Sequence, residues 1–190
     1  MNEVLVTAPS RDPITLAEAK DHMRVNWDTD DAYIAGLIRV ATEKIEHDTH
    51  RALMEQTWNF YLDEFPSRVQ YIEIPKPPLS SITEIYYTIS AAATEWASSN
   101  YVVDTYSLVG RVILAEGSSF PNHDTIPNAI RIKAVCGYGS FSDVPETLRH
   151  AIKWYVSHLF NEREPLTEAP RRELPLGIKN AINQYEVFTV

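Results

Sequence analysis

The chain has 190 residues, of which 44% are hydrophobic and 23% are charged, and its formal net charge is −9 at pH 7. This length and composition are typical of one globular domain, or of one domain with an insertion. The acidic balance argues against a protein that grips DNA phosphates, because that function needs clustered Lys and Arg.

Cysteine content and hydropathy narrow the expected location. Cys136 is the single cysteine, so no disulfide can form within the chain. The first residues lack the basic segment and apolar run of a signal peptide, and no apolar stretch approaches the roughly 20 residues that cross a membrane. We therefore expect the protein in the cytoplasm when it is made, with no membrane partner.

Two helices are predicted in the first third of the chain. Thr15 and Glu18 have the spacing of a capping box, which opens a helix over about residues 15–25. A polar turn follows, in which Asp28 can cap a longer helix over about residues 29–51. The longer helix has an apolar stripe at helical spacing: Ile34, Ile38, Ala41 and Ile45.

From Gln56 the hydrophobic period changes from that of a helix to that of a strand. Trp58, Phe60 and Leu62 alternate with polar residues. Further short strands are predicted at about residues 71–74, 85–89, 101–104, 111–114 and 130–136. Because these strands are short and closely spaced, we expect an antiparallel sheet rather than parallel βαβ units.

The clearest helix signal covers residues 143–161. Asp143, Pro145 and Glu146 are typical of a helix start. Its core stripe is Leu148, Ile152, Tyr155 and Leu159, and a second face carries His150, Trp154 and His158. Trp154 on a mostly polar face suits contact with another helix pair or with another copy of the chain. A last helix is predicted over about residues 175–185.

These elements predict an α+β protein. We expect a small four-helix core, built from helices at about 15–25, 29–51, 143–161 and 175–185. In domain terms, residues 1–55 and 139–190 would form the helical core, and residues 56–138 an antiparallel β-rich insertion.

Residues that could support a reaction are few. Glu43, His47 and His50 lie within two helical turns and could ligate a metal, although His side chains at a helix C-terminus also offset its partial negative charge. Cys136 alternates with core-side residues, which favours a buried side chain over a nucleophile. The sequence therefore predicts no catalytic residue, no metal and no cofactor.

Two alternative functions remain open on the residues alone. One is a metal-dependent enzyme that uses Glu43, His47 and His50. The other is a small helical DNA-binding module, suggested by the two helices at the start. The helix at 29–51 carries more acidic than basic residues, which argues against the second alternative.

Short motifs in order along most of the chain carry a family resemblance. They are Thr15–Lys20, His22–Val25 with Asp30 and Asp31, Arg51–Leu53, Gln56–Trp58, Ile74–Leu79 with Ile82, Val144–Glu164, and Leu174–Gly177. Together they resemble the head–tail connector proteins of tailed phages, which are head-completion adaptors also found in prophages and gene transfer agents. Residues 91–128 and the tail after Tyr185 match no part of that family pattern.

The resemblance implies a structural role rather than an enzymatic one. It implies a ring of about twelve copies below the portal protein, although a single copy can be monomeric in isolation. The ring would extend the channel for double-stranded DNA without sequence-specific binding, and an acidic lumen would repel phosphate. Its partners would be the portal and a tail-side stopper or tail terminator protein. The location would be the bacterial host cytoplasm during assembly and then the head–tail junction of the virion.

Two sets of contact residues follow from this expectation. Tyr33, Trp154 and His158 are expected to contribute to contacts between subunits or helices. The β-prone tail is expected to dock on the portal by strand addition, with Tyr185, Val187, Phe188 and Val190 as candidates.

Overall fold

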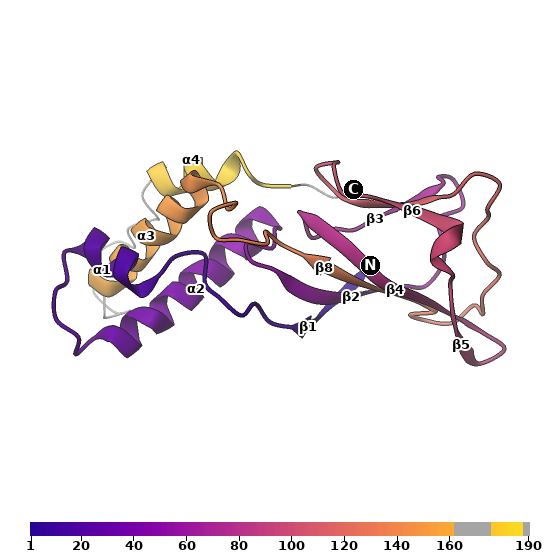
Figure 1. Cartoon of the computed structure of the whole chain (residues 1–190), viewed down its shortest axis with the longest axis horizontal. Helices are drawn as coiled ribbons and strands as arrows, with labels where there is room; N and C mark the ends of the chain where they lie inside the picture. Colours follow the sequence, from indigo (N-terminus) through magenta and orange to yellow (C-terminus); the bar gives the residue numbers. More distant parts are fainter. Residues whose placement is uncertain (162–175, 188–190) are drawn as a thin grey trace, which may run out of the picture. The chain divides into compact units, whose positions relative to one another are not determined.

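The computed structural model describes residues 1–161 and 176–187, and these form two compact units (Figure 1). The first, called here the β unit, combines Met1–Ser10 with Glu55–Gly139. The second, called here the helical unit, combines Arg11–Met54 with the described residues from Ser140 onward.

The helical unit is built on three helices that each pack against the other two: α1 (Leu16–Met23), α2 (Asp31–Thr49) and α3 (Glu146–Asn161). A two-turn helix, α4 (Leu176–Asn183), packs on α2 and α3 and contributes the buried Ile182. The core consists of apolar side chains at helical spacing: Ala19, Ile34, Ile38, Ala41, Ile45, Leu148, Ala151, Ile152 and Val156.

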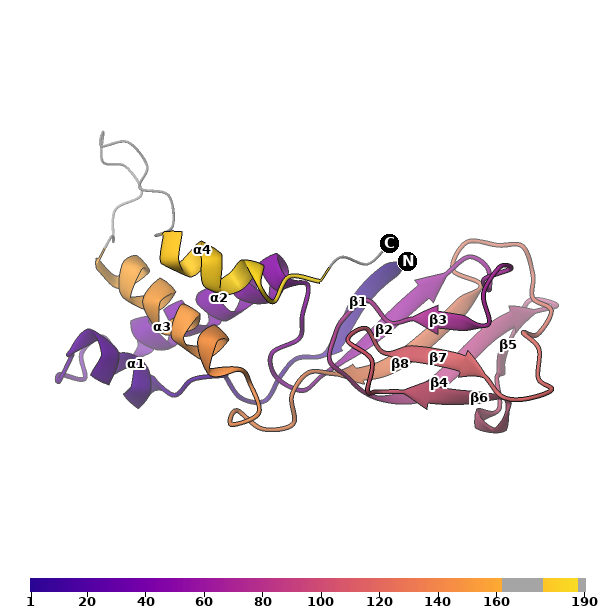
Figure 2. The ribbon, with the colours of Figure 1, turned by 90° about the horizontal axis from the view of Figure 1, so that it is seen from above.

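The β unit contains two antiparallel sheets that lie one above the other (Figures 1 and 2). The five-stranded sheet has the order β1 (Asn2–Thr7), β2 (Gln56–Leu62), β8 (Ile130–Cys136), β4 (Leu79–Ile89) and β5 (Ala92–Glu95). The three-stranded sheet has the order β3 (Tyr71–Glu73), β7 (Arg111–Leu114) and β6 (Tyr101–Asp104). A 3₁₀ turn at Ser98–Asn100 leads into β6.

Strand β8 is the centre of the larger sheet because it pairs with both β2 and β4. Its residues alternate strictly between buried and half-buried positions. Ile132, at the middle of β8, lies between Phe60 of β2 and Ile85 of β4, and all three side chains are fully buried. The smaller sheet adds buried Ile72 and Val112 to the same apolar core.

The predicted four-helix core with an antiparallel β-rich insertion is wrong as a description of this fold. Three helices rather than four pack mutually in the helical unit. The strands form two sheets with an apolar core of their own, and strand β1 comes from the N-terminus, outside the predicted insertion. The prediction failed because hydrophobic periodicity locates single elements but does not show which elements bury their faces together.

Gly110, just before β7, lies where the chain approaches Leu79 of β4 too closely for a larger side chain. A Cβ at this position would lie 2.2 Å from the Cβ of Leu79 on β4, and Leu79 could not move away without its backbone. We expect Gly110→Ala to destabilise the protein by about 1–3 kcal/mol through overpacking, measured as a lower Tm in thermal unfolding. Gly139→Ala is the matched control in the β unit, since a Cβ there would meet nothing within 4 Å. Equal Tm values for the two variants would contradict this packing.

Candidate functional site

Arg149 on α3 joins three segments of the helical unit. Its side chain is largely buried, and its Nε donates to the carbonyl of Pro13 at 3.2 Å. Its guanidinium also hydrogen-bonds to Glu18 on α1 and to Glu146, the latter at 2.7 Å. The same group lies over the ring of Phe141, 5.6 Å from its centroid. One cation thus fixes the entry to α1 against the first turns of α3.

Glu18 takes part in this contact and also closes the predicted capping box. Its carboxylate accepts from the amide of Thr15 at 2.7 Å, and its own amide donates to the Thr15 hydroxyl at 3.2 Å. Burial alone would raise the pKa of Glu18, but the hydrogen bonds from Thr15 and the charges of Arg149 and Lys153 bring it below its ordinary value. The carboxylate therefore stays charged at neutral pH and keeps its ion pair.

The acidic turn between α1 and α2 is also neutralised within the chain. Lys20 binds both Asp28 and Asp31, each at 2.7 Å. These hydrogen bonds raise the pKa of Lys20 and lower that of Asp28. Asp30, and not the predicted Asp28, occupies the N-cap position of α2, and its carboxylate accepts from Trp27 at 2.9 Å. Lys20 of α1 and Trp27 of the turn thus bind these acidic side chains.

The three predicted contact residues lie on α2 and α3. Tyr33 and Trp154 are each 41% exposed, which is high for large aromatic side chains, and His158 is half-buried. Tyr33 lies beside Phe160, with ring centroids 6.2 Å apart, and Trp154 lies beside His150 at 6.1 Å. Trp154 and Phe160 are six residues apart on α3, so they point about 120° away from each other. The structure therefore places Tyr33 and Trp154 in two separate aromatic pairs.

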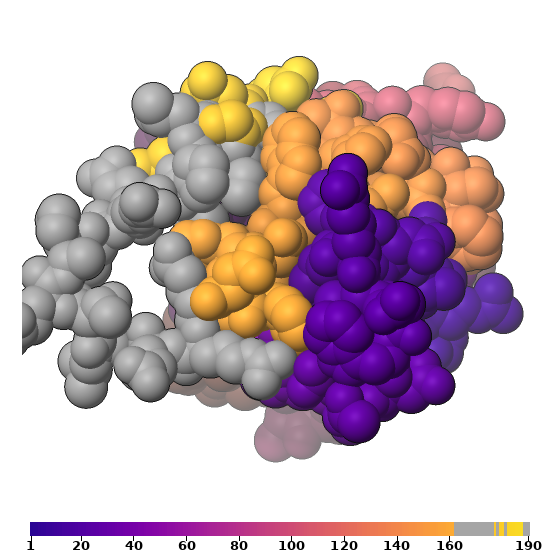
Figure 3. All heavy atoms as spheres, turned by 90° about the vertical axis from the view of Figure 1, so that its left-hand side faces the viewer, coloured from indigo at the N-terminus to yellow at the C-terminus, as the bar shows by residue number. Residues whose placement is uncertain are grey.

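His150, which lies beside Trp154 on α3, is close to His22 of α1. Figure 3 shows α1 in indigo beside α3 in orange at this end of the helical unit. Glu146 lies 3.6 Å from both His150 and Lys153. His22 of α1 is close to the same cations, and its pKa is lowered first by burial and then by the charges of His150 and Lys153.

The described part of the C-terminal tail is held on the end of α2. Arg51, which is nearly buried, donates from Nε to the carbonyl of Tyr185 at 2.8 Å and lies over its ring at 5.9 Å. The amide of Val187 donates to the carbonyl of Thr49 at 3.2 Å, and the Val187 side chain is buried. The remaining tail candidates, Phe188 and Val190, lie outside the described residues.

The alternative metal site finds no support in the described part of the chain. Residues 1–161 and 176–187 contain no group of three His, Cys, Asp or Glu side chains arranged to hold a metal ion. The rings of His47 and His50 are 6.4 Å apart, and Nδ1 of His47 lies 3.4 Å from Asp48. Cys136 is buried, which raises its pKa to about 12 and disfavours a thiolate nucleophile. No described helix is long and apolar enough to cross a membrane.

The β6–β7 hairpin of the β unit lies within residues 91–128, which match no part of the family pattern. The β6–β7 hairpin is braced at Asp104, which accepts from Ser107 Oγ at 2.6 Å and from Arg111 Nη2 at 2.7 Å. The amides of Tyr106 and Ser107 donate to the same carboxylate. These hydrogen bonds, from Ser107 first and then Arg111, lower the pKa of Asp104. In the sequence, this arrangement is indicated only by an Asp at the start of a turn, where its carboxylate can accept from the amides two and three residues later.

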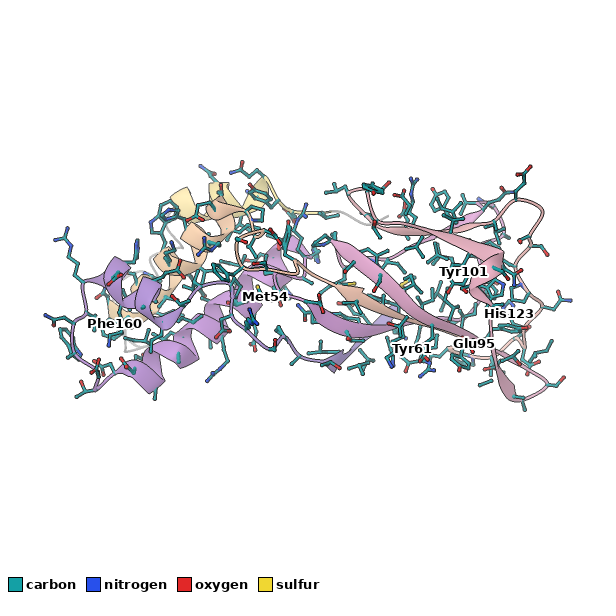
Figure 4. All side chains as sticks on the ribbon, viewed as in Figure 1. Met54, Tyr61, Glu95, Tyr101, His123 and Phe160 are labelled. Atoms are coloured by element: carbon teal, nitrogen blue, oxygen red, sulfur yellow. The ribbon has the colours of Figure 1, made fainter. Side chains whose placement is uncertain are left out.

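An aromatic cluster fills the end of the same unit. Phe65 stacks on Phe120 at 4.9 Å and meets the edges of Trp96 and His123 at 5.6 and 5.4 Å. Tyr101 packs on Trp96 at 5.1 Å, and Figure 4 labels Tyr101 and His123 at this end. Burial, and secondarily the charge of Glu95, raises the pKa of Tyr101. The cluster is a local core that holds the long segment between β7 and β8.

We expect His22 to make the helical unit sensitive to mild acid. Its lowered pKa means that the folded state favours the neutral imidazole, so its contribution to stability is complete above about pH 6.5 and is lost as the pH falls below that value. We expect His22→Gln to reduce the drop in Tm between pH 7.5 and 5.5. The exposed His47→Gln variant is the control and should keep the wild-type drop. Equal drops in His22→Gln and wild type would contradict this coupling.

Comparison with solved structures shows the same fold in gene transfer agent particles. A chain from the neck of an empty GTA particle computed with C6 symmetry has a TM-score of 0.79 and 22% identity. Chains from the virion of a native gene transfer agent particle and from the neck of a native GTA particle computed with C12 symmetry have TM-scores of 0.79 and 0.80, with 23% and 22% identity. Each match covers 100% of this chain and 97% of the other.

Structures that are only 22–23% identical to this chain show its fold but not its family, and the family follows from the sequence comparison. No curated protein matches the chain. A family model for Phage gp6-like head–tail connector proteins matches residues 13–110, which is more than half of the chain. The family is structural rather than enzymatic, and the resemblance inferred from the sequence motifs is confirmed. The chain belongs to the Phage gp6-like head–tail connector protein family.

Proposed function

We propose that this chain forms a closed ring below the portal, where it extends the DNA channel and joins the head to the tail. The observation that carries the proposal is the family match, supported by a fold shared over the whole chain with neck proteins of a GTA particle. The necks of that particle were computed with C6 and C12 symmetry. A ring of about twelve copies of this chain would follow from heterologous contacts between neighbours.

The charge of the chain suits a channel through which DNA slides. With a net charge of −9 per copy, a ring would present strong negative potential to the DNA phosphates. Repulsion from the wall would let the duplex pass without binding, and no sequence-specific contact is required. The Lys and Arg side chains that could bind phosphate are in part already paired, as Lys20 and Arg149 are.

Within this proposal the exposed aromatic residues of the helical unit contact neighbouring subunits. Trp154 is the strongest candidate, because an exposed tryptophan gains the most free energy when a partner covers it. Tyr33 and His158 are proposed to contribute from the same unit. The tail that begins at Tyr185 is proposed to reach the portal, with Tyr185 and Val187 securing its base to α2.

The proposal is tested by removing the chain from particles and returning it in variant forms. Particles assembled without it should be filled heads that lack tails in negative-stain electron microscopy, because no ring would join the two parts. Trp154→Asp should fold with a wild-type Tm yet enter particles at least tenfold less, since a hot-spot tryptophan is worth about 2 kcal/mol or more. Trp154→Phe is the matched control and should enter particles.

Two results would count against different parts of the proposal. Heads that carry tails in the complete absence of this chain would refute the connector function. Normal incorporation of Trp154→Asp would leave that function standing but would remove Trp154 from the subunit contact.

A further inference from the structure

The β unit has open strand edges on two opposite sides. Strand β1 is an end strand of the five-stranded sheet and pairs only with β2. Strand β6 is an end strand of the three-stranded sheet and pairs only with β7. Figure 2 shows β1 and β6 on opposite sides of the two stacked sheets. Among the described residues, no strand pairs with the outer backbone groups of β1 or β6, so these groups can pair with a strand of another chain.

The second half of strand β1 exposes a short apolar run. Every residue of β1 is exposed, including the apolar run Val4–Val6. Val4 and Leu5 lie on opposite faces of the strand, and the register with β2 shifts between Leu5 and Thr7. Its one charged residue, Glu3, lies 3.5 Å from Lys76, which in turn lies over the ring of Trp58 at 4.5 Å. An apolar edge strand without a free charge is rare on isolated soluble proteins, because it promotes pairing between chains.

The β6 edge continues into the most exposed apolar surface of the described chain. Val102 on β6 and Tyr106 and Leu108 in the hairpin are 59%, 101% and 64% exposed, the three highest values among the large hydrophobic side chains described. The charges here, Asp104 and Arg111, bind each other at 2.7 Å. Because Asp104 braces the hairpin, the exposed side chains are held in place before any partner binds, which lowers the entropic cost of binding.

We propose that neighbouring copies in the ring join head to tail, with strand β1 of one copy placed along strand β6 and its hairpin in the next. The inference rests on the proposed ring. A closed ring needs two different surfaces on opposite sides of one chain, and β1 and β6 meet that requirement.

Charge favours a second copy of this chain as the occupant of both edges. Two copies that each carry −9 repel one another, so contact between them is least costly where charges are already neutralised. Glu3 and Asp104, the acidic residues of the two edges, each have a cation of their own. Strand β5, at the far end of the larger sheet, is a weaker candidate because it exposes only small residues and Glu95.

Cross-linking of engineered cysteines in assembled particles tests this contact. The native Cys136 is buried, so a short bis-maleimide should react with introduced cysteines alone. We expect the double variant Val4→Cys/Val102→Cys to form a ladder of covalent multimers, because each copy would be linked to both neighbours. Each single variant should give no ladder, since a head-to-tail contact never brings two identical positions together.

The control variant is Val4→Cys/Thr94→Cys, which moves the second cysteine to the β5 edge. A ladder from this control and none from the first pair would overturn the proposal in favour of β5. No ladder from either pair, in particles that mass spectrometry shows to contain the chain, would also overturn it while leaving the connector function intact. Absence of the chain from complete particles would instead refute the connector function.

Charge exchange provides a second test that does not depend on cysteine reactivity. Val4→Lys should enter particles at least tenfold less than wild type, and Val102→Glu on the neighbouring edge should restore entry when the two changes are combined. Unchanged Tm values would show that the variants fold. Normal entry of Val4→Lys, or failure of the combined variant to recover, would overturn the proposed pairing.

Discussion

The pairing of acidic side chains with specific cations is the interaction on which the rest of this structure depends. The chain has 26 acidic and 17 basic residues, so not every carboxylate can have a Lys or Arg partner of its own. Lys20 and Arg149 each bind two carboxylates and thereby fix α1 to the turn before α2 and to α3. In the β unit, Arg111 binds the carboxylate of Asp104 and stabilises the β6–β7 hairpin. The chain keeps a net charge of −9, and in the proposed ring part of this charge would face the DNA.

Because the chain is strongly acidic, its neutral and apolar surfaces are the best places for contact between copies. Contact between copies of a strongly acidic protein is least costly where charges are locally neutralised. The exposed edges β1 and β6 meet that condition, and Trp154 offers an aromatic contact on the helical unit. Each unit has its own apolar core, so both can present preformed surfaces without depending on assembly to fold. Preformed surfaces lose less entropy on binding, which suits a subunit of the proposed ring.

The family and many single helices and strands could be predicted from the sequence, but the way in which they pack together could not. The capping box at Thr15 and the alternating pattern of β8 are local signals, and both predicted structures are present. The division of strands into two sheets depends on contacts between distant residues, such as Gly110 against Leu79, which leave no periodic trace. The contacts of Arg149 with Pro13 and Glu18 and of Arg51 with Tyr185 were not predicted, because these partners lie more than 100 positions away in the chain. The exposed hairpin at Tyr106 lies in the segment that matched no family motif.

The most direct measurement of the central claim is a cryo-EM reconstruction of the neck at a resolution that separates β-strands. The account predicts a closed ring of this chain between portal and tail, with β1 of each copy beside the β6 edge of its neighbour and unpaired acidic residues facing the DNA. A neck without a ring of this chain would contradict the connector function. A ring in which β1 and β6 both face solvent would contradict the proposed head-to-tail pairing.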